Sequence, residues 1–166
     1  YLSGQAEESI PLLARAADGQ KDEAKALSLY YRGTILNRLG RFEEAQASLD
    51  AALAVRPDLI LARQEKGESL WQLNRRPEAI AVWEDTVRRS PNLALSQLFL
   101  AGAERTMGRF AEADAHEAQA GQSIPRDPLY YRMLALRLRN VGMQDLARAY
   151  LDRALQLSQG NLPPSS

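Results

Sequence analysis

The sequence lacks several groups on which catalytic and metal sites depend. It has no cysteine and a single histidine, His116, among 166 residues. Zinc sites of the usual thiolate or imidazole kind therefore cannot be assembled from it. It also contains no glycine-rich phosphate loop, no nucleophile elbow and no loop with the acidic spacing that binds calcium. We predict no catalytic residue, no metal and no cofactor, and we expect that the chain is not an enzyme.

Charge and hydropathy argue against two further functions. The 21 basic residues balance the 21 acidic residues, so no overall field attracts nucleic acid. No apolar run approaches the ~20 residues that a membrane span needs. The absence of cysteine does not decide the compartment, and bacterial cytoplasm and periplasm both stay open. Because residue 1 is tyrosine rather than methionine, we expect that the chain is a piece of a longer protein.

The sequence does contain a period of 34 residues. The stretch NRLGRFEEAQ at 37–46 returns in altered form as WQLNRRPEAI at 71–80, RTMGRFAEAD at 105–114 and RNVGMQDLAR at 139–148. Two positions of each copy hold small residues, which allow helices to cross closely. A third holds glycine or asparagine, which can end a helix in the left-handed conformation. These columns are Gly33, Gly67, Ala101 and Ala135; Ala45, Ala79, Ala113 and Ala147; and Gly40, Asn74, Gly108 and Gly142.

Proline and helical spacing complete the pattern of each copy. Pro57, Pro91 and Pro125 occupy one column near the end of the first three copies, where they would stop a helix. Between the glycine and proline columns, apolar residues recur at the spacing of a helix. No segment shows the alternation of apolar and polar residues that is typical of a strand. Each copy is therefore predicted to form a helix, a tight turn and an antiparallel helix.

This pattern resembles the tetratricopeptide repeat family. The resemblance implies an all-α fold, a right-handed superhelical solenoid of antiparallel helix pairs. It divides the chain into four repeats at 26–59, 60–93, 94–127 and 128–161. Residues 1–25 are predicted to be a partial N-terminal repeat with Gly4 at the turn position, and 162–166 a disordered tail.

The third repeat departs from the family pattern. Gln97, Glu104 and Glu117 occupy positions that are usually apolar, and Gly102 and Gly121 are expected to interrupt its helices. Because an unpaired buried carboxylate is costly, we expect these polar groups to be paired or partly exposed. Two readings follow, a satisfied polar contact or a softer repeat that flexes when a partner binds.

The resemblance also implies a binding surface. In the family the first helix of each repeat lines a concave groove that holds a peptide, helix or loop of another protein. Trp71 has two open interpretations, an anchor for the partner or a ring packed on the neighbouring first helix. Arg105, Arg132 and Arg139 favour an acidic partner. The alternative is that they form ion pairs with carboxylates nearby in the same chain. The predicted groove residues are Tyr30, Thr34, Asn37, Arg38, Gln64, Glu68, Trp71, Leu98, Arg105, Arg132, Leu136 and Arg139.

One family function is not predicted. Chaperone-binding members hold a carboxylate with lysine, asparagine and arginine at five set positions. Those positions are here Tyr30, Thr34, Glu65, Leu95 and Phe99. None of the five matches, so we do not expect binding to the C-terminal tails of heat-shock chaperones.

The alternative function is a scaffold or spacer. Repeat segments of this kind occur in bacterial assemblies for exopolysaccharide export, pilus formation or secretion, and the Ala-, Leu- and Arg-rich composition is typical of bacterial proteins. The chain would then stack or self-associate through its terminal helices, with Leu146, Tyr150 and Leu157 at the contact. His116 is expected to be a surface residue with no role in either function.

Overall fold

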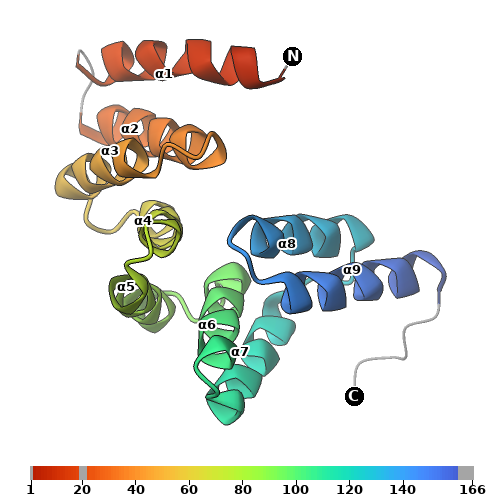
Figure 1. Cartoon of the computed structure of the whole chain (residues 1–166). Coiled ribbons are helices and arrows are strands. Elements are labelled where there is room, and N and C mark those ends of the chain that lie inside the picture. The colour runs from red at the N-terminus through yellow and green to blue at the C-terminus, as the bar shows by residue number, and fades with distance from the viewer. Residues whose placement is uncertain (1, 19–21, 161–166) are drawn as a thin grey trace. The chain divides into compact units, whose positions relative to one another are not determined.

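The chain folds into α-helices joined by short turns. The computed structural model describes residues 2–18 and 22–160, and in these ranges it contains nine helices and no strand (Figure 1). The predicted all-α helical repeat fold is thereby confirmed. The tail predicted at 162–166 lies outside the described residues. The helices are α1 (Leu2–Asp18), α2 (Asp22–Arg38), α3 (Phe42–Val55), α4 (Ile60–Gln72), α5 (Arg76–Arg89), α6 (Ala94–Thr106), α7 (Phe110–Ser123), α8 (Pro128–Asn140) and α9 (Gln144–Ser158).

The same turn ends α2, α4, α6 and α8. The residue in the glycine or asparagine column has a positive φ in all four turns. The amide that follows it donates to a carbonyl five residues back, as Arg41 N does to Leu36 O at 2.9 Å. This bond closes the helix end and turns the chain into the next helix. The prediction of a left-handed residue at this column is therefore confirmed at Gly40, Asn74, Gly108 and Gly142.

Asn74 offers a direct test of this turn. Its φ is 60°, a region that asparagine tolerates because its short polar side chain can hydrogen-bond locally. Alanine has no such group and adopts this region at a cost of about 1–2 kcal/mol. We expect Asn74→Ala to lower the free energy of unfolding by about 1 kcal/mol, and Asn74→Gly to leave it unchanged or raise it. Urea unfolding of the two variants decides the matter. Equal stability of the two would contradict the conformational argument.

The helices form two compact units, Tyr1–Arg89 and Ser90–Ser166. In the first unit α1 packs on α2, and each helix from α2 to α5 contacts the next. Its core has two clusters. One joins Ile10 of α1 to Leu36 and Ala45. The other joins the α2–α3 pair to the start of α4 through Ala26, Leu49, Ala52, Leu59 and Ala62.

Two glycines of the first unit allow its helix pairs to close. A Cβ on Gly33 would lie 2.6 Å from Cγ of Leu49, and a Cβ on Gly67 would overlap the indole of Trp83. Both indole and leucine side chain are fully buried. The small residue and the large one are thus a matched pair across each crossing, as the small-residue column predicted for these two copies.

The N-terminal helix differs from the prediction at its start. Gly4 was expected in a turn, yet it lies inside α1, which begins at Leu2. The turn at the other columns needs a positive φ, and Gly4 does not have one. Arg41 Nη1 pairs with Glu7 Oε2 at 2.8 Å. The α2 helix also begins at Asp22, ahead of the predicted repeat boundary at residue 26, with Asp22 and Glu23 in its first turn where they suit the positive helix terminus.

In the second unit α6 packs on α7 and α8 on α9, and α6 also contacts α8. The α8–α9 pair closes around Leu134, Leu138, Tyr150 and Ala154, which are fully buried. The Tyr150 ring stacks on Tyr131, with ring centroids 5.6 Å apart. Both predicted interruptions are wrong, because α6 runs unbroken through Gly102 and α7 through Gly121. A single glycine costs a helix about 1 kcal/mol, which the packing of the unit outweighs.

The unusual polar residues of the third repeat form a connected network. Gln97 Nε2 donates to Pro91 O at 3.0 Å, which turns Gln97 Oε1 towards His116 Nδ1 at 2.6 Å. His116 Nε2 lies 3.5 Å from Glu104 Oε1, and Arg109 Nη2 lies 3.7 Å from the same oxygen. The expectation that these groups are paired is confirmed, and His116 joins two helices instead of standing alone at the surface.

Candidate interaction surfaces

Asn37 is occupied by contacts within its own unit. Its Nδ2 donates to Glu65 O at 3.0 Å and to Glu65 Oε2 at 3.3 Å. Ser69 Oγ donates to Asn37 Oδ1 at 2.7 Å. Asn37 therefore joins α2 to α4, and a partner would have to displace these bonds to reach its amide. We leave it out of the proposed surface.

Trp71 lies half-buried at the end of α4. Its ring centroid is 5.6 Å from that of Trp83, and the guanidinium of Arg76 lies 5.1 Å from its centroid. The ring therefore packs within its own α4–α5 pair. The contact is with the second helix of the pair, whereas a neighbouring first helix was expected.

The other predicted residues of the first two repeats fall into two groups. Tyr30 and Thr34 are half-buried and Arg38 is exposed on α2. The Tyr30 ring lies 5.1 Å from the exposed ring of Tyr31. Gln64 and Glu68 of α4 are buried, as is Leu98 of α6, so their side chains are not presented at the surface in this structure.

The three arginines predicted to attract an acidic partner have different surroundings. Arg105 Nη2 lies 2.7 Å from Asp114 Oδ1 and 3.1 Å from Glu117 Oε2, so it is paired locally. Arg132 and Arg139 on α8 are exposed, and neither has a carboxylate within ion-pair distance among residues 2–18 and 22–160. Only these two guanidinium groups of the three are free to meet an acidic partner.

An ion pair opens the second helix of three of the four repeats. Arg41 pairs with Glu44 at 2.6 Å and Arg75 with Glu78 at 2.6 Å. Hydrogen bonds from these arginines lower the pKa of Glu44 and Glu78 below the usual range. Arg109 and Glu112 form the third pair, at 3.2 Å. The fourth repeat has Met143 and Leu146 at these two positions, which removes the charges and leaves an apolar turn.

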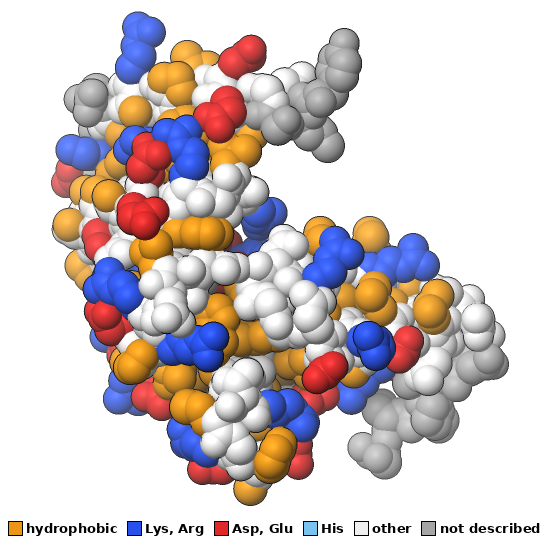
Figure 2. All heavy atoms as spheres, viewed as in Figure 1, with side chains coloured by type: hydrophobic (Ala, Val, Ile, Leu, Met, Phe, Trp, Pro, Cys, Tyr) orange, Lys and Arg blue, Asp and Glu red, His pale blue; other side chains and the backbone are white. Residues whose placement is uncertain are grey.

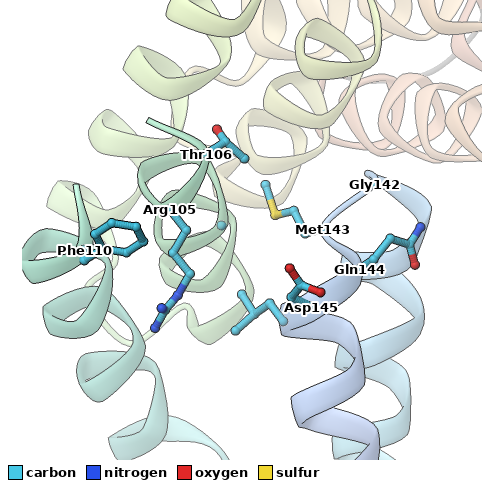
Figure 3. Close-up of a pocket in the computed structure, with 9 residues that line it drawn as sticks. Arg105, Thr106, Phe110, Gly142, Met143, Gln144 and Asp145 are labelled. Carbon is cyan, nitrogen blue, oxygen red and sulfur yellow. The ribbon is translucent and has the colours of Figure 1, made fainter. Parts of the chain in front are cut away.

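A cavity of about 380 Å³ lies beside this apolar turn. Met143 extends from the α8–α9 turn towards α6 and meets Gly102, where a Cβ would overlap its sulfur. Phe110, at the start of α7, lies on the other side, and the Asp145 carboxylate is at the start of α9 (Figure 3). We call this space the turn cavity. It is lined by Gly102, Arg105, Thr106, Phe110, Gly142, Met143, Gln144, Asp145 and Leu146.

The turn cavity holds residues that the groove prediction did not include. Arg105 was predicted, whereas Phe110, Met143 and Asp145 were not. A signal for them exists in the sequence. The arginine of the ion-pair column becomes Met143 in one copy only, and a glycine, Gly102, occupies the first-helix position that faces it. When an arginine position holds an apolar residue in one copy only, and the facing residue is glycine, the sequence indicates that this copy makes a different contact.

The prediction of a stacking end is wrong for Leu146 and Tyr150, which are 6% and 0% exposed. The Tyr150 ring stacks on Tyr131 of α8 inside the α8–α9 pair. Leu157 is half-buried, and its predicted role stays a prediction. The exposed apolar residues of this pair lie on another face and include Leu129 and Leu155.

Clusters of metal-binding side chains and helices that could cross a membrane were both sought in the part of the chain that the structure describes. No group of three or more histidine, aspartate or glutamate residues there is placed to hold a metal ion. None of its helices is both long and apolar enough for a bilayer crossing.

Comparison with known proteins agrees with an all-α helical repeat. A tetratricopeptide repeat family model matches residues 26–59. A crystal structure of MamA aligns with a TM-score of 0.68 and 16% identity, over 95% of this chain and 91% of that one. MamA 41-end from Desulfovibrio magneticus RS-1 gives 0.66 and 22%, over 96% and 89%. No curated protein matches the sequence.

A larger repeat protein has the same local fold. In the crystal structure of the APC/C hetero-tetramer Cut9-Hcn1, the alignment has a TM-score of 0.69 at 18% identity. It covers 96% of this chain and 30% of the other. These likenesses establish the fold, a repeat of antiparallel helix pairs. The match at 26–59 identifies one tetratricopeptide repeat within that fold.

Proposed function

We propose that this chain is a non-catalytic protein-interaction module that holds a segment of another protein on the exposed parts of its first helices and in the turn cavity. The turn cavity carries the proposal, because it combines an apolar wall with charged groups at its rim. Phe110 is 60% exposed, and a large aromatic ring left in water at a hollow is typical of a contact surface. The cavity volume of about 380 Å³ is ample for one large apolar side chain.

The rim charges define what the cavity favours. Arg105 is already neutralised by Asp114 and Glu117, whereas Asp145 has no ion pair in the described part of the chain. A partner residue with an apolar or aromatic side chain, next to a lysine or arginine, satisfies both the wall and Asp145. In the first unit, Tyr30, Arg38 and Trp71 remain the candidates for contact with the same kind of partner.

Selection from a displayed library of random 16-residue peptides against the immobilised chain tests this function. We expect enriched peptides to share an aromatic or large aliphatic residue beside a basic one. Their affinity should fall about tenfold for Phe110→Ala, because a buried anchor typically contributes more than 1 kcal/mol. Met107→Ala is the matched control, since Met107 is 48% exposed and does not line the cavity. Peptides that bind Phe110→Ala as tightly as the parent chain would contradict the proposal.

A further inference from the structure

A buried carboxylate lies at a core position of the third repeat. Glu104 is 3% exposed, and the equivalent positions of the other repeats hold buried leucines. A leucine needs no polar partner there. A buried carboxylate needs a counter-charge or a proton, because its removal from water is costly. The equivalent leucines are Leu36, Leu70 and Leu138.

The single histidine of the chain occurs in the same repeat and meets this carboxylate. His116 Nε2 lies 3.5 Å from Glu104 Oε1. In the other repeats the position of His116 holds Ser48, Val82 and Tyr150. Two departures from the repeat pattern, one on α6 and one on α7, thus contact each other. We infer that the histidine is the partner that the carboxylate needs.

The hydrogen bonds of Gln97 determine which ring nitrogen of His116 carries the first proton. Gln97 Nε2 donates to Pro91 O at 3.0 Å, so its Oε1 is the atom that lies 2.6 Å from His116 Nδ1. An amide oxygen can only accept, and Nδ1 must therefore donate. In a neutral ring Nε2 would then be an acceptor that faces the ionised Glu104 with no hydrogen between them. One further proton, on the ring or on the carboxyl group, removes this conflict.

The charges around this contact are balanced when that proton is present. Arg109 Nη2 lies 3.7 Å from Glu104 Oε1, and its Nε lies 3.2 Å from Glu112 Oε1. One guanidinium is therefore shared by two carboxylates, which leaves one negative charge for His116 to cancel. Acidic and basic side chains are interspersed over this part of the surface (Figure 2), so local pairs decide the charge here. Three other charged residues of the α6–α7 pair are paired with one another: Arg105, Asp114 and Glu117.

We propose that the native α6–α7 pair binds one proton between His116 and Glu104, and that loss of this proton loosens the pair as the pH rises. In the unfolded chain, histidine and glutamate side chains release their protons at about pH 6.5 and about pH 4.3. Above about pH 6.5 the native state therefore binds more protons than the unfolded state, and stability falls with rising pH. The contribution is complete just below about pH 6.5, where the unfolded histidine is protonated too.

The helix pair that this proton stabilises also forms part of the turn cavity. Arg109 N donates to Glu104 O at 2.9 Å in the bond that closes the α6–α7 turn. Arg105, Thr106 and Phe110, on either side of this turn, line the cavity. A looser pair at higher pH would therefore change the cavity wall. Binding of the proton itself needs no partner, so its test can fail without affecting the proposed function, and the reverse also holds.

Urea unfolding between pH 5.5 and 8.5 tests the proposal. Because the chain has one histidine, comparison of the parent with His116→Gln isolates the contribution of that ring. From pH 6 to pH 8.5, the unfolding equilibrium constant of the parent relative to His116→Gln should rise about fivefold or more, since one proton can contribute up to about tenfold per pH unit. Glu104→Gln should remove or reverse this dependence, because an amide can donate to Nε2 of a neutral ring. Glu43→Gln, the same change at an exposed position of α3, should retain it.

Hydrogen exchange of the parent chain locates the effect and needs no variant to fold. After correction for the intrinsic exchange rate at each pH, protection of the amides in 94–123 should fall from pH 6 to pH 8.5. Protection of the amides in 22–55, in the first unit, should stay constant. In a folded His116→Gln or Glu104→Gln chain, both segments should keep the same protection over this range.

Three results would overturn the proposal. Parallel stability curves for the parent and His116→Gln would mean that the native pair holds no proton that the unfolded chain releases. The same pH dependence in Glu104→Gln and in the parent would mean that Glu104 does not share the proton. An equal loss of amide protection in 22–55 and 94–123 would mean that the response does not arise in the α6–α7 pair.

Discussion

Replacing Trp83 by alanine should lower the free energy of unfolding by about 3–5 kcal/mol, as truncation of a large buried aromatic generally does. The indole is 0% exposed. Its Nε1 lies 3.4 Å from Gln64 O, and its ring lies against Trp71. Without it, the space opposite Gly67 would be empty, and the α4–α5 pair could not close without moving the backbone. Urea unfolding followed by circular dichroism gives the measurement.

A matched pair of variants tests whether this packing is specific. Phe110→Ala removes an aromatic ring that is 60% exposed and should change stability by less than about 0.5 kcal/mol. Gly67→Ala should cost about 1–3 kcal/mol by overpacking against the indole. Combining Gly67→Ala with Trp83→Leu should cost less than the sum of the two single changes, because the smaller side chain leaves room for the new Cβ. If the losses from Gly67→Ala and Trp83→Leu simply added, the two residues would not pack against each other as described. A loss below about 1 kcal/mol for Trp83→Ala would contradict the buried packing of the indole.

Stability should also fall at alkaline pH because of Tyr150. Burial of its side chain raises the pKa of the phenol well above its usual value, and the nearby Arg153 guanidinium opposes this only in part. The native state therefore keeps the proton after the unfolded state has begun to lose it. The contribution is complete below about pH 10, the unfolded pKa. It then declines by up to about 1.4 kcal/mol per pH unit as the pH rises towards the folded pKa.

The difference between the parent chain and Tyr150→Phe isolates this effect from other titrating groups. Urea unfolding between pH 8 and 11.5 should show the parent losing stability faster than Tyr150→Phe above about pH 10. Tyr31→Phe, at a ring that is 54% exposed, should follow the parent curve. Parallel curves for the parent and Tyr150→Phe over the whole range would mean that the phenol ionises as easily in the native state as in the unfolded one.

Features with a local cause could be predicted from the sequence. The left-handed residue in each turn depends on its own backbone conformation, so one column of glycine and asparagine was enough to find four turns. The proline column likewise marks helix ends, since α3, α5 and α7 stop at Val55, Arg89 and Ser123, two residues before each proline. The prediction of a turn at Gly4 was wrong because a glycine does not by itself form a turn. Gly4 has no positive φ, and helix α1 runs through it.

Features that depend on a distant partner were predicted less well. Asn37 sits at a groove position by count, but residues 28 and 32 positions later, Glu65 and Ser69, occupy its side chain. His116 looked isolated because its neighbours Gln97 and Glu104 come from another helix. The turn cavity arose from one departure, Met143, in an otherwise charged column. The 34-residue period predicts which positions face a neighbouring helix. The contact made at such a position depends on which residue each repeat has there.

The recurring turn has a consequence for how such a chain can change length. The closing bonds run from Arg41, Arg75, Arg109 and Met143 to the carbonyls of Leu36, Leu70, Glu104 and Leu138, each 34 residues after the last. We expect that deleting or duplicating a block of that size within the repeats keeps the turns and the positions that face a neighbour in register. A block one residue longer would rotate the following helix by about 100° and bring its polar side inward. We therefore expect recombination between copies to be tolerated better in register than out of register.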